Sequence, residues 1–136
     1  MKHGIFLAAL ALALAVPAFA DDPAPAKSYT CLHYKDVFGW GARDKHSMIV
    51  DDRFGRKYLV SLQGICSDLD FSLGMGFRPL GRGGFCVERG DHVIMGGGGA
   101  SPVQGTCWVT KVQYYTKDMQ EADKLARANK QPLAEY

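Results

Sequence analysis

Two short groups of acidic residues contain the side chains best suited to chemistry. Asp68 and Asp70 are separated by one leucine, shortly after a cysteine, and Asp91 directly precedes His92. Paired carboxylates can bind a hard cation or take part in acid–base chemistry, and a carboxylate can orient an imidazole that acts as a base. Aspartate in such positions also caps turns and accepts backbone N–H bonds. We favour the structural interpretation for both groups. A small hydrolase or metal-dependent enzyme that uses these Asp and His side chains is the alternative.

The sequence lacks the longer motifs that usually accompany such enzymes. It contains no Gly-x-Ser-x-Gly, no His-Glu-x-x-His and no calcium-loop pattern. The glycine-rich stretches 81–84 and 96–99 lack the Lys-Ser/Thr ending of a phosphate loop and are typical of hairpin loops. We therefore predict no catalytic residue, no cofactor and no bound metal.

Four cysteines form the third group: Cys31, Cys66, Cys86 and Cys107. An even number in a small exported chain indicates two disulfides, and four cysteines allow three pairings. We favour Cys31–Cys107 with Cys66–Cys86, which would join the first strand to the last and close the central segment. No two cysteines have the close Cys-x-x-Cys spacing of a structural zinc site. A thiol-active or metal-handling protein remains a second alternative.

The first twenty residues have the pattern of a secretory signal. A basic start at Lys2 precedes an apolar run over 5–16, and Ala-Phe-Ala at 18–20 fits a cleavage site. The apolar run is shorter than the roughly 20 residues that a membrane-spanning helix needs. The pattern predicts a bacterial protein that is cleaved after Ala20, lies in the periplasm or is secreted, and has no stable membrane insertion afterwards.

The remaining residues predict one small, mainly β domain. We expect a flexible Pro/Ala tether over 21–28, a β domain over 29–116 and a C-terminal helix over 117–131. Alternating apolar residues and turn signals place the strands at 29–37, 47–51, 58–62, 71–77, 85–87, 92–95 and 106–115. We expect a turn over 38–41 and a hairpin formed by the strands at 47–51 and 58–62. Short strands with one terminal helix favour a disulfide-stapled barrel or sandwich, and an oligonucleotide/oligosaccharide-binding (OB) barrel is one candidate.

Several of these segments also occur in the order of a known family. They are Cys31, Val50-Asp51-Asp52, 58–62, the run 64–71 with its Cys-x-Asp-Leu-Asp-aromatic element, Cys86 before Asp91, and Cys107 before the last strand. From Cys31 to about Leu125 the chain resembles an uncharacterised exported bacterial family of four-cysteine proteins, the domain-of-unknown-function family numbered 6491. The resemblance implies a shared fold and a cell-envelope location, and it implies no activity.

Charge and motifs together favour a binding or structural role. The 136 residues carry a formal net charge of only +2, which predicts no steering toward nucleic acid. We predict a non-enzymatic binding or structural module of the bacterial cell envelope, whose partner is an unidentified ligand or envelope protein.

Overall fold

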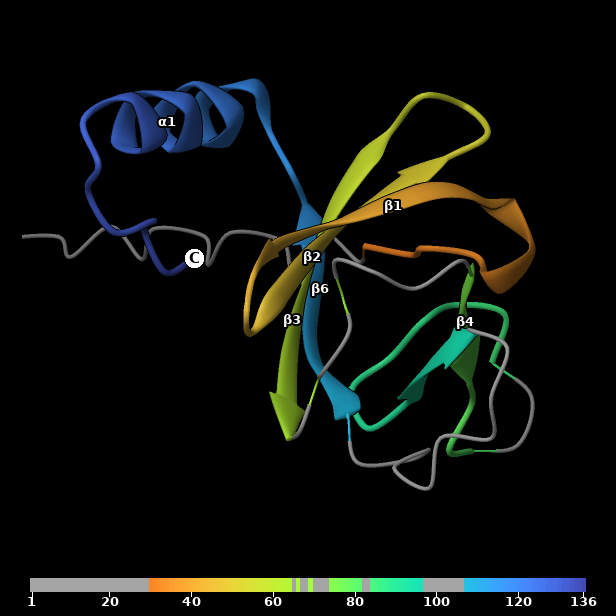
Figure 1. Ribbon diagram of the computed structural model, residues 1–136. Coiled ribbons are helices and arrows are strands. Elements are labelled where there is room, and N and C mark those ends of the chain that lie inside the picture. The colour runs from red at the N-terminus through yellow and green to blue at the C-terminus, as the bar shows by residue number, and fades with distance from the viewer. Residues whose placement is uncertain (1–29, 65, 67–68, 70–73, 82–83, 97–106) are drawn as a thin grey trace, which may run out of the picture.

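The computed structural model describes residues 30–64, 66, 69, 74–81, 84–96 and 107–136 (Figure 1). The expected signal sequence and tether, the pair Asp68 and Asp70, and the glycine stretch 96–99 beyond Gly96 lie outside these residues. The described elements are η1 (Tyr34–Asp36), β1 (Val37–Asp44), β2 (Ser47–Asp52), β3 (Lys57–Gly64), β4 (Gly74–Arg78), β5 (His92–Gly96), β6 (Cys107–Tyr114) and α1 (Lys117–Ala128).

The strands of the described part form one antiparallel sheet in the order β1-β2-β3-β6-β5-β4. The sheet curls into a half-barrel (Figure 1), which confirms the predicted mainly β fold with a C-terminal helix. The predicted hairpin of β2 and β3 is also confirmed, with Val50 opposite Tyr58. β3 lies between β2 and β6, so its backbone is hydrogen-bonded along both edges.

The core lies on one face of the central strands. Tyr58, Val60 and Leu62 alternate along β3 and are almost completely buried. Successive side chains of a strand point to opposite faces, so Leu59 and Ser61 belong to the other face. Leu59 is nevertheless only 1 % exposed. The second face of the sheet is therefore also shielded from solvent at Leu59.

The first strand differs from the prediction. A strand was expected over 29–37 and a turn over 38–41, but η1 occupies 34–36 and β1 begins at Val37. Gly39 and Gly41 suggested a turn, yet both lie within β1, an edge strand whose pairing shifts register between Val37 and Gly39. Edge strands tolerate glycine and bulges, so the glycines bend this strand without ending it.

The residues before η1 pair with a distant segment. Val87 N–H donates to Leu32 O at 2.7 Å, and Tyr34 N–H donates to Phe85 O at 3.2 Å. An isolated antiparallel bridge joins His33 and Cys86 between these two hydrogen bonds. We call segments 31–34 and 85–87 the closing ladder, because this pairing links the start of the described chain to the segment that leads into β5.

The disulfides are Cys31–Cys86 and Cys66–Cys107, with Cα–Cα distances of 5.1 Å and 4.9 Å. Two staples are confirmed, but the favoured pairing, Cys31–Cys107 with Cys66–Cys86, is wrong. That preference assumed that the first and last strands are neighbours. β6 instead pairs with β3, which places Cys107 opposite Gly64 and so beside Cys66. The closing ladder brings Cys31 to Cys86.

α1 begins where the sequence indicated. Thr116 caps the helix, because its side chain accepts a hydrogen bond from Met119 N–H at 3.4 Å. The helix projects at the end of the molecule away from β4 (Figure 1), and its Leu125 is 63 % exposed. No helix among the described residues has both the length and the apolar character that a membrane crossing requires.

Candidate functional site

Asp91, one of the residues selected from the sequence, is buried with only 4 % of its surface exposed. Its Oδ2 accepts hydrogen bonds from the Tyr34 hydroxyl and, at 2.8 Å, from Glu88 N–H. Its Oδ1 accepts from Leu80 N–H at 3.0 Å. We call these four residues the Asp91 clamp. Both carboxylate oxygens are engaged, and they tie η1, the chain at Leu80 and the turn before β5 to one point.

Local sequence explains why Asp91 occupies this place. Gly90 has φ +96°, a conformation that glycine adopts without strain, and Asp91 N–H closes the turn on Glu88 O at 3.2 Å. Asp91 O then accepts from Val109 N–H at 2.8 Å, which anchors the turn to β6. Burial, followed by the contact with Asp91, raises the pKa of the Tyr34 hydroxyl, so this hydroxyl remains a donor.

His92 follows Asp91 but takes part in a different arrangement. It is the first residue of β5 and pairs with Arg78 and Trp108. Neighbouring residues of an extended chain point in opposite directions. In the described part of the chain no hydrogen bond joins the Asp91 carboxylate to the His92 imidazole. The carboxylate-oriented base considered from the sequence is therefore not assembled here.

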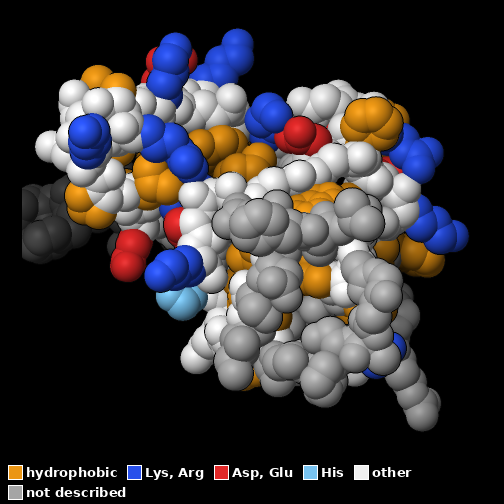
Figure 2. All heavy atoms as spheres, viewed as in Figure 1, with side chains coloured by type: hydrophobic (Ala, Val, Ile, Leu, Met, Phe, Trp, Pro, Cys, Tyr) orange, Lys and Arg blue, Asp and Glu red, His pale blue; other side chains and the backbone are white. Residues whose placement is uncertain are grey.

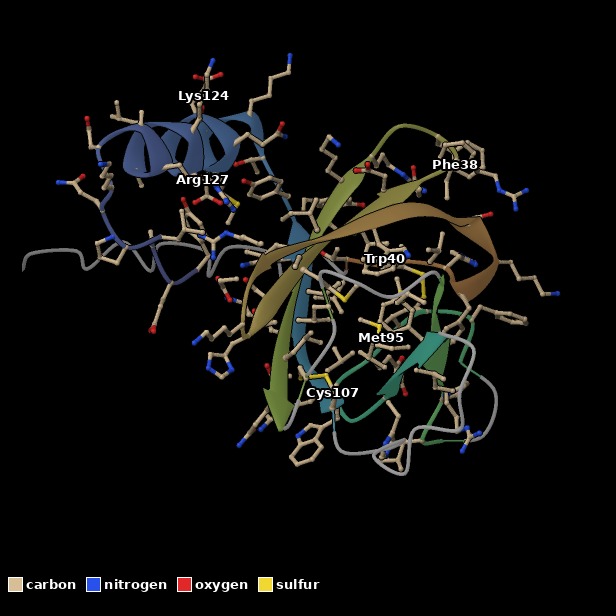
Figure 3. All side chains as sticks on the ribbon, in the orientation of Figure 1. Phe38, Trp40, Met95, Cys107, Lys124 and Arg127 are labelled. Atoms are coloured by element: carbon tan, nitrogen blue, oxygen red, sulfur yellow. A yellow bond between two sulfur atoms is a disulfide. The ribbon has the colours of Figure 1, made fainter. Side chains whose placement is uncertain are left out.

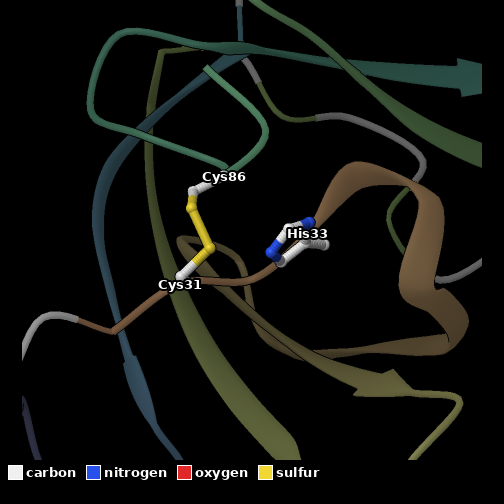
Figure 4. Close-up of side chains that lie close together, drawn as sticks. All are labelled: Cys31, His33 and Cys86. Carbon is white, nitrogen blue, oxygen red and sulfur yellow. A yellow bond between two sulfur atoms is a disulfide. The ribbon is translucent and has the colours of Figure 1, made fainter.

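A second group surrounds the Cys31–Cys86 disulfide. The two sulfur atoms and a ring nitrogen of His33 all lie within 4.8 Å of one another (Figure 4). Both cysteines are partly exposed and His33 is exposed, with its ring stacked on Phe85 at 6.4 Å between centroids. All four cysteines of the chain are in disulfides. In this oxidation state the group is a staple beside an imidazole, because thiolates and not disulfide sulfurs are the usual metal ligands.

A third group attaches α1 to the sheet. Arg43 on β1 binds Asp123 on α1 through two hydrogen bonds, from Nε to Oδ2 at 2.5 Å and from Nη2 to Oδ1 at 2.7 Å. The Tyr115 hydroxyl donates to Asp123 Oδ2 at 2.7 Å. The two ionic side chains are only 5 % and 4 % exposed. We call Arg43, Tyr115 and Asp123 the Arg43 hub.

The electrostatics of the Arg43 hub follow from its geometry. The hydrogen bonds from Arg43 lower the pKa of the Asp123 carboxyl, outweighing the effect of burial, and Tyr115 adds to the lowering. Burial, with the contact to Asp123, raises the pKa of Tyr115 to about 12. The pair is therefore ionic and Tyr115 is neutral near neutral pH. Arg127 adds a hydrogen bond from Nη2 to Arg43 O at 2.9 Å, and Figure 3 shows it on the sheet side of α1 with Lys124 on the outer side.

A pocket of about 440 Å³ lies next to the Arg43 hub. Its walls come from β1 to β3 and from the residues after α1: Arg43, Asp44, His46, Ser47, Leu59, Ser61, Leu62, Leu133, Ala134, Glu135 and Tyr136. Arg43 Nη2 donates to Ala134 O at 2.7 Å, and the Tyr136 ring lies 5.1 Å from the Arg43 guanidinium. The C-terminal segment 133–136 therefore forms the outer wall of the pocket that Leu59 also lines. Hydrophobic side chains show at the surface between α1 and the sheet (Figure 2).

Neither the pocket nor the Arg43 hub was predicted from the sequence. One signal was present in the expected C-terminal helix, because Asp123 lies at helical spacing among the apolar residues Met119, Ala122 and Ala126. A carboxylate inside an apolar stripe needs a buried partner. Nothing in the spacing of the sequence indicated that Arg43, in a stretch expected to follow a turn, supplies that partner.

The chain matches a protein-family model over most of its length. The model of a family described as a family of unknown function, DUF6491, matches residues 1–131. No curated protein and no solved structure matches the chain. The matched range includes both disulfides, the Asp91 clamp, the Arg43 hub and the strand side of the pocket. The outer wall over 133–136 lies beyond it.

Proposed function

This chain belongs to the DUF6491 family, whose function is unknown, and we propose that it is a non-enzymatic binding module of the bacterial cell envelope. The pocket beside Arg43 is the observation that carries the proposal. Ligand sites are typically concave, with apolar walls and a few polar groups that fix orientation. Leu59, Leu62 and Leu133 supply apolar wall here, and Arg43 and Ser61 supply polar groups.

The use of the buried carboxylates supports binding over catalysis. Asp91 accepts three side-chain or backbone hydrogen bonds in its clamp, and Asp123 accepts three in the Arg43 hub. A general acid or base must exchange a proton with a substrate within hydrogen-bond reach. Carboxylates whose oxygens hold the fold together are poorly placed for that exchange.

The charges around the pocket indicate the class of ligand. Arg43 is paired both with Asp123 and with Asp44, whose Oδ2 lies 3.0 Å from Arg43 Nη1, and Glu135 adds a further carboxylate, so the carboxylates here outnumber the guanidinium. A ligand with net negative charge would be repelled by this lining. We infer an amphipathic ligand that is neutral or cationic, with its apolar part against the three leucines.

A fluorescent probe tests the pocket directly. The uncharged dye phenylnaphthylamine brightens in apolar surroundings, and we expect it to bind the purified chain saturably. Ser61→Phe fills the pocket from its wall and should abolish this binding. Gln63→Phe adds the same side chain to an exposed position of β3 outside the pocket and should leave it unchanged. Circular dichroism checks that both variants fold. Absence of saturable binding, or equal binding by both variants, would exclude this pocket as the ligand site.

A further inference from the structure

We propose that reduction of the Cys31–Cys86 disulfide converts this staple into a binding site for Zn²⁺ or a similar divalent transition-metal ion, with Cys31, Cys86 and His33 as ligands. The three ligand atoms already lie within 4.8 Å of one another (Figure 4). This inference does not depend on the ligand pocket, which lies on other elements.

The donor set fits zinc. Zinc binds thiolate sulfur at about 2.3 Å and imidazole nitrogen at about 2.0–2.1 Å in tetrahedral sites. Ligand atoms of one such ion therefore lie roughly 3.5–4 Å apart. Opening the disulfide lets the two sulfur atoms separate to that distance, while the imidazole is already within reach. The three groups leave the fourth position to water, because His33 is exposed and both cysteines are partly exposed.

The closing ladder should keep the ligands together after reduction. Its backbone hydrogen bonds, Val87 N–H to Leu32 O and Tyr34 N–H to Phe85 O, do not involve the sulfur atoms. Leu32 and Val87 are 0 % and 2 % exposed, so each segment is also anchored in the core. The Asp91 clamp adds a further tie, because its carboxylate binds Tyr34 on one segment and Glu88 next to the other.

The conversion needs a two-electron reductant, and a dithiol supplies the electrons by thiol–disulfide exchange. A thiolate of the dithiol attacks one cysteine sulfur to give a mixed disulfide and releases the other cysteine. The second thiol of the reductant then displaces the bound cysteine, so the dithiol leaves as a disulfide and Cys31 and Cys86 are thiols. Metal binding displaces one proton from each thiol, and neutral His33 donates its ring nitrogen lone pair. The bound ion then holds both thiolates and opposes reoxidation.

The second disulfide provides an internal control. Among the described residues, the group that could hold a metal consists of Cys31, His33 and Cys86, and it does not include Cys66 or Cys107. A variant that carries Cys66→Ser and Cys107→Ser keeps the proposed site. A variant that carries Cys31→Ser and Cys86→Ser keeps two cysteines of similar sequence separation without the histidine.

Cobalt spectroscopy of the reduced chain tests the site. Each variant is reduced with a phosphine, desalted without oxygen, and titrated with Co²⁺ and then Zn²⁺. The variant that keeps Cys31 and Cys86 should give a thiolate-to-cobalt charge-transfer band that Zn²⁺ abolishes, and the other variant should not. His33→Gln should weaken binding by more than about tenfold with both thiols still titratable.

Three outcomes would overturn the proposal. Equal bands in the two cysteine variants would show that any reduced pair binds the ion. Unchanged metal affinity of the His33→Gln variant would show that His33 is not a ligand. Loss of near-ultraviolet circular dichroism on reduction, without metal binding, would show that the fold, closing ladder included, does not hold the ligands together without the staples.

Discussion

At the scale of single residues, buried aspartates fix the turns between strands through hydrogen bonds. Asp52, which is 3 % exposed, accepts from Phe54 N–H at 2.9 Å, Arg56 N–H at 2.8 Å and Arg56 Nε at 2.6 Å, and so shapes the turn between β2 and β3. Burial alone would raise the pKa of the Asp52 carboxyl, but these hydrogen bonds lower it on balance. Asp91 does the same for the turn before β5. In both places a buried carboxylate accepts hydrogen bonds from backbone N–H groups and so fixes the path of the chain.

The Asp91 clamp leads to a prediction about stability. Asp91→Asn replaces one acceptor oxygen by an NH₂ group, which would face a backbone N–H or the Tyr34 hydroxyl. Leaving such a buried donor without a partner costs about 1–3 kcal/mol. We expect a loss of that size in the free energy of unfolding, measured by urea denaturation.

Two controls give this prediction its specificity. Glu121→Gln removes a carboxylate from an exposed position of α1 and should change stability by less than about 0.5 kcal/mol. Tyr34→Phe removes one clamp donor, so its effect should not add to that of Asp91→Asn. Fully additive losses, or a fully stable Asp91→Asn variant, would show that the clamp does not support the fold.

At the scale of elements, α1 depends on the Arg43 hub for its position. Isolated helices shorter than about 12–15 residues are marginal in water, and this helix spans Lys117–Ala128 with Leu125 still exposed. The apolar contact of α1 with the sheet is therefore small, and the ionic pair of Arg43 and Asp123 holds the helix against the sheet. Removing one partner of a buried pair is costly because the other charge loses compensation, and Arg43 would keep only the partly exposed Asp44, 3.0 Å from its Nη1.

We predict that Asp123→Asn releases α1 and leaves the sheet folded. Backbone amide hydrogen exchange should become much faster across α1 and the pocket wall at 133–136. The amides of β3 and β6 should keep their protection, because those strands pair with each other. Lys124→Gln, on the outer side of the same helix (Figure 3), should leave exchange in α1 unchanged. Loss of protection in β3 as well would mean that the helix and the sheet unfold as one unit.

Acidic pH should release α1 from the sheet as Asp123→Asn does. The pKa of Asp123 is lowered in the folded chain, so its contribution to stability is complete above the ordinary aspartate pKa of about 4. That contribution is lost as the pH falls through the lower, folded-state pKa. Exchange in α1, corrected for the intrinsic effect of pH, should therefore accelerate relative to β3 at acidic pH. The Asp123→Asn variant should lack this acid-dependent change.

The elements differ in how well the sequence predicts them. β2, β3, β5 and β6 were expected within a few residues, since each has apolar residues at strand spacing and flanking turn signals. β1 was missed because Gly39 and Gly41 are typical of a turn. Only the pairing with β2, which no local pattern shows, places both glycines in a strand. The Arg43 hub joins residues 80 positions apart, and the disulfide pairing depends on which strands are neighbours. Such long-range contacts leave no local pattern in the sequence.

At the scale of the whole molecule, the two staples secure the half-barrel at separate places. Cys66–Cys107 lies at the end of the β3–β6 pair, and Cys31–Cys86 lies on the closing ladder. The bridged residues are 41 and 55 positions apart, so each bridge would stabilise the fold by roughly 4 kcal/mol in the chain-entropy description. A small domain gains much of its net stability from staples of this size. The fold should therefore need an oxidising compartment to reach full stability.

Export is the prediction that follows from this dependence and from the signal pattern of the first twenty residues. We expect the chain expressed in a Gram-negative bacterium to appear in the periplasm, cleaved after Ala20. Intact mass after iodoacetamide should show no label without prior reduction and four labels after it. Leu12→Arg interrupts the apolar run and should hold the chain in the cytoplasm, uncleaved and labelled at its cysteines, whereas Leu12→Ile should be exported normally. A periplasmic chain that takes up label before reduction would show that the disulfides are not closed there. An uncleaved wild-type chain would contradict the predicted signal peptide.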